Sequence, residues 1–284
     1  MLRLLPGGPF DREKALPPEI VRNVEARYGL DQPLAQQYAS YLGGVLRGDL
    51  GPSYKYLGRD VSDVIAESLP VSLQLGAAAL ALALAGGVSV GLVSGMRRGR
   101  ALDRGLVMLS LLGVSVPSFV LGAALILGVA LYLDWLPGGL WESPAHVLLP
   151  ALTLAALPLA TIAQLTRASV IEVAQRDFVR TARAKGVPER VVRRRHVLRN
   201  ALLASITYFG PLLAMLLTGS FVVEKIFAVP GMGRFFVTAV TNRDYPLVLG
   251  VTLVYAALVV VANLIVDLLY AWLDPRIRVR GESE

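Results

Sequence analysis

The stretch 167–200, RASVIEVAQRDFVRTARAKGVPERVVRRRHVLRN, is an Arg-rich loop between two apolar segments that are each long enough to cross a bilayer. Helix-forming residues run without interruption from Ile171 to Lys185. Gly186 is a typical C-terminal stop, and Pro188 stands where a second helix can begin. The sequence therefore predicts a bent pair of helices that stands out of the membrane.

Small residues occupy the predicted bend, at Ala182, Ala184 and Gly186. Because they carry little side chain, we expect the backbone of another protein to be able to approach there. Charged residues surround the bend: Arg180, Arg183, Lys185 and Arg190. A small charged knob of this kind suits docking into a groove. Composition alone favours a plainer interpretation, in which the loop only fixes orientation by the positive-inside rule or touches anionic lipid.

Apolar residues dominate the composition: 55% of the residues are hydrophobic, 17% are charged, and the mean hydropathy is +0.58. These values place the chain among multispanning membrane proteins rather than soluble enzymes. The chain has no cysteine, which excludes disulfides, thiol nucleophiles and thiolate metal sites. Its two histidines, His146 and His196, fall in different loops without companion ligands, so we expect no metal site.

The net charge of +7 raises the question of a nucleic-acid partner. Outside the N-terminal tail, nearly all basic residues lie in three short segments, 97–104, 167–199 and 276–280. Each segment borders an apolar stretch. We therefore attribute the charge to membrane topology and expect no nucleic-acid partner.

Five apolar segments are each long enough to cross about 30 Å of hydrocarbon. They cover approximately residues 69–96, 105–133, 146–166, 201–226 and 247–273. Basic residues are dense after the first, third and fifth segments, whereas the loop after the second has Asp134 and Glu142 and no base. The positive-inside rule then places the loop 167–200 and the tail 274–284 in the cytosol.

Residues 1–68 are polar, with turn residues at regular intervals, and predict a small helical extracytoplasmic region. One short helix follows Pro18 and closes at Gly29; another follows Pro33 and carries its apolar residues on one side. Five spans with a cytosolic C-terminus require this region to be exported, yet Met1 to Phe10 has no apolar core or cleavage signature. We therefore expect a further transmembrane helix ahead of Met1, which gives six spans in the working subunit.

Small residues recur at every fourth position of the first apolar segment: Ala79, Ala83, Gly87, Gly91 and Gly95. Such a stripe lets helices approach closely, and we expect ordinary packing within the subunit rather than a gating role. Prolines interrupt the other segments: Pro117, Pro150, Pro158 and Pro211. They predict kinks that serve either a gate or irregular packing.

Asp267 is the one carboxylate well inside a predicted span. An ion at mid-membrane costs about 2.5 to 3.5 kcal/mol, so it needs a partner or water. It shares a helix face with Asn263, Tyr270 and Asp274, near the cytosolic boundary. This shallow depth favours bonding to the neighbouring loop over proton coupling.

The loop 227–246 has a turn at Pro230-Gly231, an apolar stretch too short to span, and a second break from Asn242 to Pro246. It predicts a short re-entrant helix in the outer mouth. The GMG at 231–233 is no phosphate loop, because no strand precedes it.

The run FVRTARAKG at 178–186, with His196 and Leu198 downstream, resembles the EAA-type loop of ATP-binding-cassette importer permeases in its peptide and nickel branch. The chain keeps Ala182, Gly186 and Leu198 of the general pattern. It departs from that pattern with Arg180, Thr181, His196 and Arg199, as that branch does. The resemblance implies an ATPase-coupling loop made of Asp177, Arg180, Thr181, Ala182, Arg183, Ala184, Lys185, Gly186 and His196.

Two further segments extend the resemblance over essentially the whole chain. LLPGGPFDREKALPPEIVRNVEARYGL and GDLGPSYKY, within residues 1–68, resemble the extracytoplasmic segment of the first permease subunit of oligopeptide importers. The loop 227–246 resembles the VPGxGxxF…NRDYP segment of the same family. It implies an external mouth made of Pro230, Gly231, Gly233, Asn242, Arg243, Asp244, Tyr245 and Pro246.

The chain has no G-x-x-x-x-G-K-[ST] motif, so it cannot hold ATP by that device. The resemblance implies an all-α, type I importer permease fold in the bacterial inner membrane, non-catalytic and without its own cofactor. It also implies a homologous second permease, two cytosolic ATPases that bind ATP and magnesium, and an extracytoplasmic peptide-binding protein.

Oligopeptide import is the function we expect, with dipeptide or nickel import by the same branch as the alternative. An ion-coupled secondary carrier would call for paired buried ionisable residues and internal repeats. The sequence shows only Asp267 and no visible repeat, so this class is less favoured.

Overall fold

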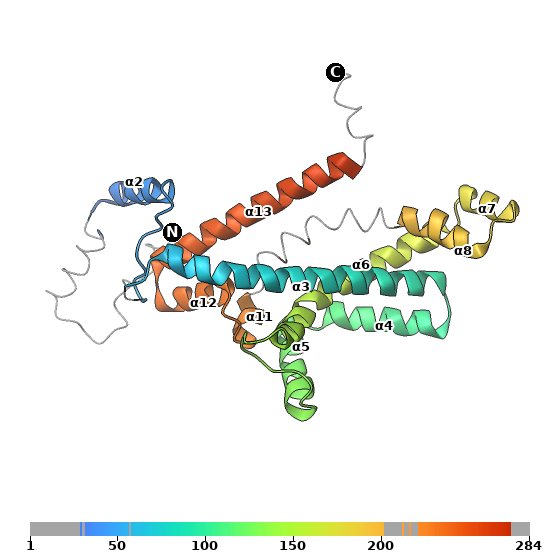
Figure 1. Cartoon of the computed structure of the whole chain (residues 1–284), viewed down its shortest axis with the longest axis horizontal. Coiled ribbons are helices and arrows are strands. Elements are labelled where there is room, and N and C mark those ends of the chain that lie inside the picture. Colours follow the sequence, from blue (N-terminus) through green and yellow to red (C-terminus); the bar gives the residue numbers. More distant parts are fainter. Residues whose placement is uncertain are drawn as a thin grey trace, which may run out of the picture.

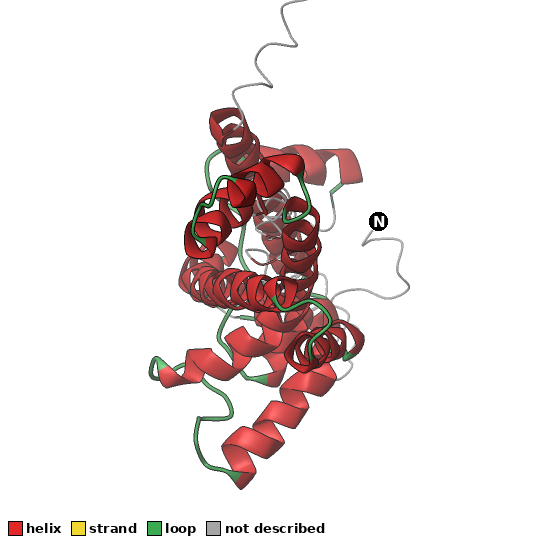
Figure 2. Ribbon diagram, turned by 90° about the vertical axis from the view of Figure 1, so that its right-hand side faces the viewer, coloured by secondary structure: helices red, strands yellow, loops and turns green. Residues whose placement is uncertain are grey.

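The computed structural model describes residues 29, 32–56, 58–201, 212, 216 and 221–273. Within these ranges the chain forms helices and loops, and its only strand-like pairing is an isolated antiparallel bridge between Pro52 and Asp60. Figure 2 looks along the long axis of this helical assembly. Three helices are long and apolar enough to cross a membrane, or four if one bent pair counts as a single span. The described part therefore has the architecture of a multi-pass membrane protein.

The centre of the fold is the pair formed by α3, Val61–Met96, and α6, Ala145–Val173, which lie side by side over most of their length (Figure 1). The small-residue stripe of α3 is buried in this seam. A Cβ atom added at Gly91 would lie only 2.6 Å from Cβ of Thr166, and one at Gly95 2.8 Å from Cβ of Val170. The expectation that the stripe serves packing within the subunit is confirmed.

Helix α3 begins at Val61, ahead of the predicted start at residue 69. The extra turns are buried, because Val61, Val64 and Ile65 form a core with residues of α12, Met232–Asn242, and α13, Tyr245–Leu273. Part of the predicted extracytoplasmic region 1–68 thus continues the first long helix.

The predicted span 105–133 is not one straight helix. It consists of α4, Ala101–Ser115, followed by α5, Ser118–Leu125, and the π-helical η2, Ile126–Tyr132. The chain bends by 109° between α4 and the continuous stretch of α5 and η2. The break falls at Val116 and Pro117, where proline disfavours a helical conformation for the residue before it; Val116 has a ψ of 121°. Pro150 and Pro158, in contrast, lie inside the continuous helix α6.

Several predicted elements lie partly or wholly outside the described residues. These are the helix after Pro18, most of the span 201–226 with Pro211, and the tail 274–284. Of the span 201–226, the structure describes α11, Phe221–Ile226, as its end. The helix expected after Pro33 is α2, Leu34–Val45, and none of its residues is buried.

The two ends of the molecule carry the two sets of predicted site residues. Figure 1 shows α7 and α8 beyond one end of the α3–α6 pair and α12 with α2 at the other. Helix α13 starts beside α12 and ends as a separate arm (Figure 1). The long helices therefore stand between the two candidate sites.

Candidate functional site

The loop after α6 folds into a hairpin of α7, Asp177–Ala184, α8, Glu189–Val191, and the π-helical η3, Val192–Leu198. Gly186 ends α7 with a φ of +74°, a conformation that favours glycine. The N–H of Val187 donates to the carbonyl of Ala182 at 3.2 Å, and that of Gly186 to Arg183 at 3.0 Å. This is the hydrogen-bond pattern of a Schellman cap. The predicted bent helix pair is present.

The hairpin packs on a small apolar core that it shares with the end of α6. Its buried members are Val170, Val173, Val179, Ala182, Val192, Val197 and Ala201. Ala182 is only 6% exposed, so its methyl group faces the core rather than an approaching protein, and close approach at the bend stays a prediction. The cause of this burial is the amphipathic period of α7, which turns Val179 and Ala182 inward together. Ala184 and Gly186 are exposed and remain candidates for contact.

The outer face of the hairpin carries most of the predicted coupling residues. Exposed side chains on it are those of Asp177, Arg180, Thr181, Arg183, Ala184 and Lys185. The ring of Phe178, 41% exposed, lies against His196 with 6.5 Å between ring centroids. An apolar ring among charged groups gives this face one anchor suited to a protein partner.

Arg183 and Glu189 tie the two arms of the hairpin together. The Arg183 guanidinium donates to both oxygens of the Glu189 carboxylate, at 3.2 Å each, and to the Ala174 carbonyl at 3.3 Å. These hydrogen bonds from Arg183 lower the pKa of Glu189. Glu189 also pairs with Arg193 at 3.8 Å, so the carboxylate stays ionised and holds both cations.

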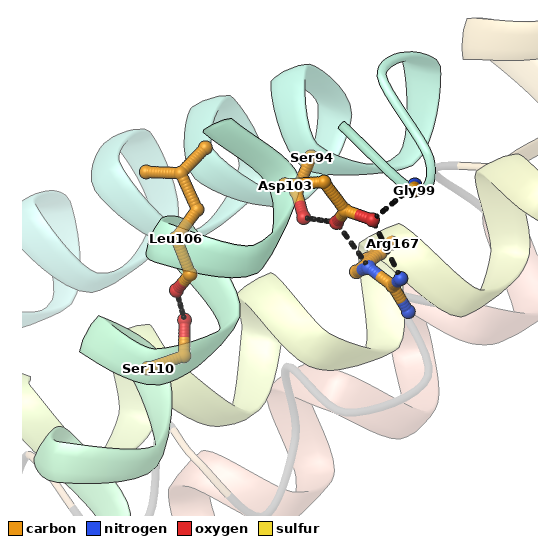
Figure 3. A network of polar contacts seen from close by, with 6 residues as sticks. All are labelled: Ser94, Gly99, Asp103, Leu106, Ser110 and Arg167. Carbon is orange, nitrogen blue, oxygen red and sulfur yellow. Dashed lines mark hydrogen bonds and ion pairs between the residues drawn. The ribbon is translucent and has the colours of Figure 1, made fainter. Parts of the chain in front are cut away.

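A partly buried ion pair lies at the base of the hairpin, where α3, α4 and α6 meet (Figure 3). The Arg167 guanidinium donates to Asp103 through Nε at 2.8 Å and Nη2 at 3.0 Å. The Ser94 hydroxyl and the Gly99 N–H donate to the same carboxylate, at 2.5 and 2.8 Å. Four donors thus satisfy a carboxylate that is almost fully enclosed. The sequence interpretation missed this site; its one signal was a lone Asp in the Arg-rich segment 97–104.

At the opposite end, the turn before α12 is built around Glu224, which exposes no surface. Its carboxylate accepts a hydrogen bond from the Ser72 hydroxyl at 2.8 Å and from the Arg234 N–H at 3.2 Å. A Cβ atom added at Gly231 would lie 2.6 Å from the carboxyl carbon of Glu224, and one at Gly233 3.0 Å from its Oε2. The two glycines leave room for the carboxylate to reach the start of α12, where helix N–H groups are free to donate.

The second break of this region is tied down by Asp244, which is fully buried. Asp244 accepts hydrogen bonds from the Ser53 hydroxyl and, at 3.1 Å, from the Tyr54 N–H. Arg243 before it has a φ of +58° and ends α12. The polar segment before α3 is thus fastened to the junction of α12 and α13.

The remaining residues predicted for the external mouth divide by exposure. Pro230 and Asn242 are exposed, Arg243 and Pro246 are half-buried, and Tyr245 is buried against the ring of Tyr54. Tyr245 and Pro246 belong to the first turn of α13 rather than to a loop. Within this predicted set, the exposed residues are the ones that can meet a partner, while Gly231, Gly233 and Asp244 shape the turn.

The predicted intramembrane pair is described only in part. Asn263 is exposed on α13, and the side chain of Asp267 lies outside the described residues. The expectation that no second buried acid accompanies Asp267 is wrong, because the fold buries Asp103, Glu224 and Asp244. Each of these three accepts at least one hydrogen bond from a distant segment, which a linear pattern does not show.

Residues 87–279 match the family of binding-protein-dependent transport system inner membrane components. Relatives include the oligopeptide transport system permease protein OppB of Haemophilus influenzae, 45% identical, and that of Escherichia coli K12, 46% identical. Each alignment covers 98% of this chain and 92% of the relative. The dipeptide transport system permease protein DppB of Bacillus subtilis is 42% identical over 100% of this chain and 92% of its own.

Two solved structures share the fold. An amino acid ABC transporter crystallised with histidines superposes with a TM-score of 0.59, at 16% identity, over 73% of this chain and 93% of that one. The methionine ABC transporter MetNI in an inward-facing conformation gives a TM-score of 0.55, at 19% identity, over 72% and 95% of the two chains. The helical arrangement around α3 and α6 is therefore that of ABC transporter permeases.

Proposed function

This chain belongs to the family of binding-protein-dependent transport system inner membrane components, and on that premise we propose that it is the permease subunit of an ATP-driven oligopeptide importer. The observation that carries the cargo assignment is the 45 to 46% identity with oligopeptide permeases along 98% of the chain. A dipeptide importer is the second candidate, supported by 42% identity with a dipeptide permease over the full chain.

The hairpin α7–α8–η3 is the proposed docking site for two cytosolic ATPases, which bind ATP and magnesium while this subunit remains non-catalytic. The apolar core that it shares with the end of α6 lets the hairpin and that end move as one rigid piece. Its outer face combines Phe178 with the cations Arg180 and Lys185. The basic segments 97–104 and 167–199 lie at this same end and support a cytosolic placement, with the C-terminus on that side too.

The opposite end is then the outer mouth, where an extracytoplasmic peptide-binding protein delivers cargo. Exposed Pro230 and Asn242 offer the contact surface there. A homologous second permease completes the pore. The exposed apolar side chains of α4, such as Met108 and Leu112, and of α13, such as Val260, suit burial in lipid or against that second permease.

In transport, ATP-driven closure of the ATPases pulls the hairpin as one body, and the helices α3 and α6 attached to it swing the pore from inward-facing to outward-facing. The binding protein then releases its peptide into the outward-facing pore. Lys185 and Asn242 mark the two ends between which this motion has to be transmitted.

A pull-down of the full-length protein in mild detergent tests the docking role. Ala184→Trp adds a bulky ring to the exposed bend, and we expect it to abolish co-purification of the ATPases while the protein still inserts. Asn242→Trp adds the same ring at the opposite end and serves as the matched control. Equal ATPase recovery from both variants would refute the docking site.

Uptake into vesicles separates the two cargo classes. Reconstituted importer with its binding protein should take up tetra- and pentapeptides on addition of ATP, and dipeptides far more slowly. Preference for dipeptides would assign the second candidate function. Uptake that continues without ATP under an imposed proton gradient would refute both candidate functions.

A further inference from the structure

The carboxylate of Asp103 is paired with a distant cation although several cations are near it in sequence. Arg98, Arg100 and Arg104 lie within five positions of Asp103 and are exposed. The ion pair instead joins Asp103 to Arg167, 64 positions away on α6. Both nitrogen donors of Arg167 face both oxygens of the carboxylate, a geometry that fixes distance and direction together.

Arg167 and the hairpin are carried by the same few turns of α6. Val170 and Val173, one and two turns after Arg167, are members of the hairpin core. The end of α3 is pressed against these turns, because a Cβ atom at Gly95 would lie 3.1 Å from the Arg167 carbonyl oxygen. Gly99 lies in the turn between α3 and α4, and its N–H donates a hydrogen bond to Asp103 (Figure 3). This bond holds the turn close to the same part of α6.

Helix α4 is the element that this joint controls. Its first turn contains Asp103, and its far end is the sharp break before α5. Helix α4 also packs along α6, since a Cβ atom at Gly113 would lie 3.1 Å from the Ala156 carbonyl oxygen, and the ion pair adds a fixed point at the start of α4. Movement of α6 at Arg167 is therefore passed to the start of α4 directly rather than through the loop 97–100 alone.

We propose that Asp103 is a positioning residue for energy coupling, whose ion pair with Arg167 makes the start of α4 move together with the hairpin. This inference rests on the proposed function, in which the hairpin is pulled by ATPases. Asp103 touches no cargo or nucleotide in this role. It acts through Arg167, and Ser94 and Gly99 complete the hydrogen bonds to the enclosed Asp103 carboxylate.

Spin labels give the direct test in the complete importer in lipid nanodiscs, with cysteine-free partner subunits. The chain has no cysteine of its own, so labels attach only at Arg98→Cys and at Arg194→Cys on η3 of the hairpin, both exposed positions outside the proposed docking set. We expect the distance between these labels to be the same with and without ATP. With Asp103→Asn added, it should shift or broaden on ATP binding. A change of about 5 Å, one helical turn, in the otherwise native complex would overturn the proposal.

The second readout is the amount of peptide transported per ATP hydrolysed. Asp103→Asn should lower this ratio roughly tenfold while the ATPases still co-purify, since coupling is lost and docking is not. Arg98→Gln removes one charge from the same turn and should leave the ratio unchanged. The exchange Asp103→Arg with Arg167→Asp should recover part of the ratio.

Arg167→Lys keeps both charges of the ion pair and loses only the two parallel hydrogen bonds to Asp103. If Asp103→Asn fails to accumulate in the membrane, the amount of peptide transported per ATP is measured in Arg167→Lys instead. A native ratio in Arg167→Lys would overturn the proposal in that event. Failure of the unsubstituted protein to bind ATPases is a different result, because it refutes the proposed function and leaves the ion pair as a structural bond.

Discussion

The Ser72 hydroxyl of α3 donates a hydrogen bond at 2.8 Å to Glu224 of α11, a residue 152 positions later in the chain. The same hydroxyl accepts from the Met232 N–H at 2.8 Å. Ser72 therefore links the central helix to both ends of the turn that leads into α12. All of these atoms are buried, so each lost bond leaves a polar group without water.

Ser72→Ala should lower the free energy of unfolding by about 2 kcal/mol or more, because it leaves the Met232 N–H and one Glu224 oxygen without their partner. Ser68→Ala is the matched control on the same helix. Ser68 is also buried, but its hydroxyl bonds only to the Val64 carbonyl of its own helix. Thermal unfolding of both variants in detergent measures the difference, and equal midpoints would contradict the role given to Ser72.

Gly231→Ala should destabilise the turn before α12 for reasons of space. The backbone of Gly231, at φ −90° and ψ 170°, is open to alanine, so the cost comes from the approach of the new methyl group to Glu224. We expect a loss of about 1 to 3 kcal/mol, in the range of overpacked sites.

Gly128→Ala is the control for Gly231→Ala. No heavy atom lies within 4 Å of a Cβ at Gly128, inside the helical segment η2. The methyl group should therefore be neutral or slightly stabilising there. If the thermal unfolding midpoint of Gly231→Ala in detergent is as high as that of Gly128→Ala, the turn before α12 can accommodate a methyl group beside Glu224.

Local chemistry made the hairpin and α12 predictable. Gly186 and Pro188 mark chain reversals by their own backbone preferences, and Pro230-Gly231 does so before α12. The small-residue stripe predicted a close helix contact by its period of four residues. Each of these signals depends on residues close together in the chain, so it can be read from a single sequence.

Tertiary partners decide what the sequence could not reveal. Ala182 looked available at a bend, yet the inward turn of α7 buries it. Asp103 looked like one more charge in a topological loop until Arg167 was brought to it from α6. The chain bends by 109° at Pro117, whereas α6 continues through Pro150 and Pro158, so a proline in the sequence did not reveal by itself which segment breaks.

Gly91→Ala should weaken the seam between α3 and α6. The added methyl group would lie 2.6 Å from Cβ of Thr166 and 3.1 Å from the Arg167 nitrogen, so the two long helices have to separate. We expect a loss of about 1 to 3 kcal/mol and lower accumulation in the membrane. Gly105→Ala, on α4 with nothing near its Cβ, provides the comparison. Equal accumulation of the two variants would mean that the seam adapts.

The ion pair of Glu189 with Arg183 gives the hairpin a defined pH dependence. The pKa of Glu189 is lowered in the fold from its ordinary value of 4.5, mainly by the hydrogen bonds from Arg183. A group with a lowered folded pKa contributes stability above its unfolded pKa and loses it as the pH falls through the folded one. Since both side chains are nearly half exposed, the contribution at neutral pH is small, about 0.5 kcal/mol.

Glu189→Gln should therefore raise amide hydrogen exchange in segment 177–198 at pH 7, and the excess over the native chain should shrink as the pH falls through the lowered pKa of Glu189, below its ordinary value of 4.5. Exchange is read by mass spectrometry and corrected for the intrinsic rate at each pH. Glu172→Gln breaks the exposed pair between Glu172 of α6 and Arg176, the residue before α7, and leaves the hairpin arms joined, so it should not change exchange in that segment. An excess for Glu189→Gln that does not shrink at any pH below 4.5 at which the protein stays folded would mean that the carboxylate acts through packing rather than through its charge.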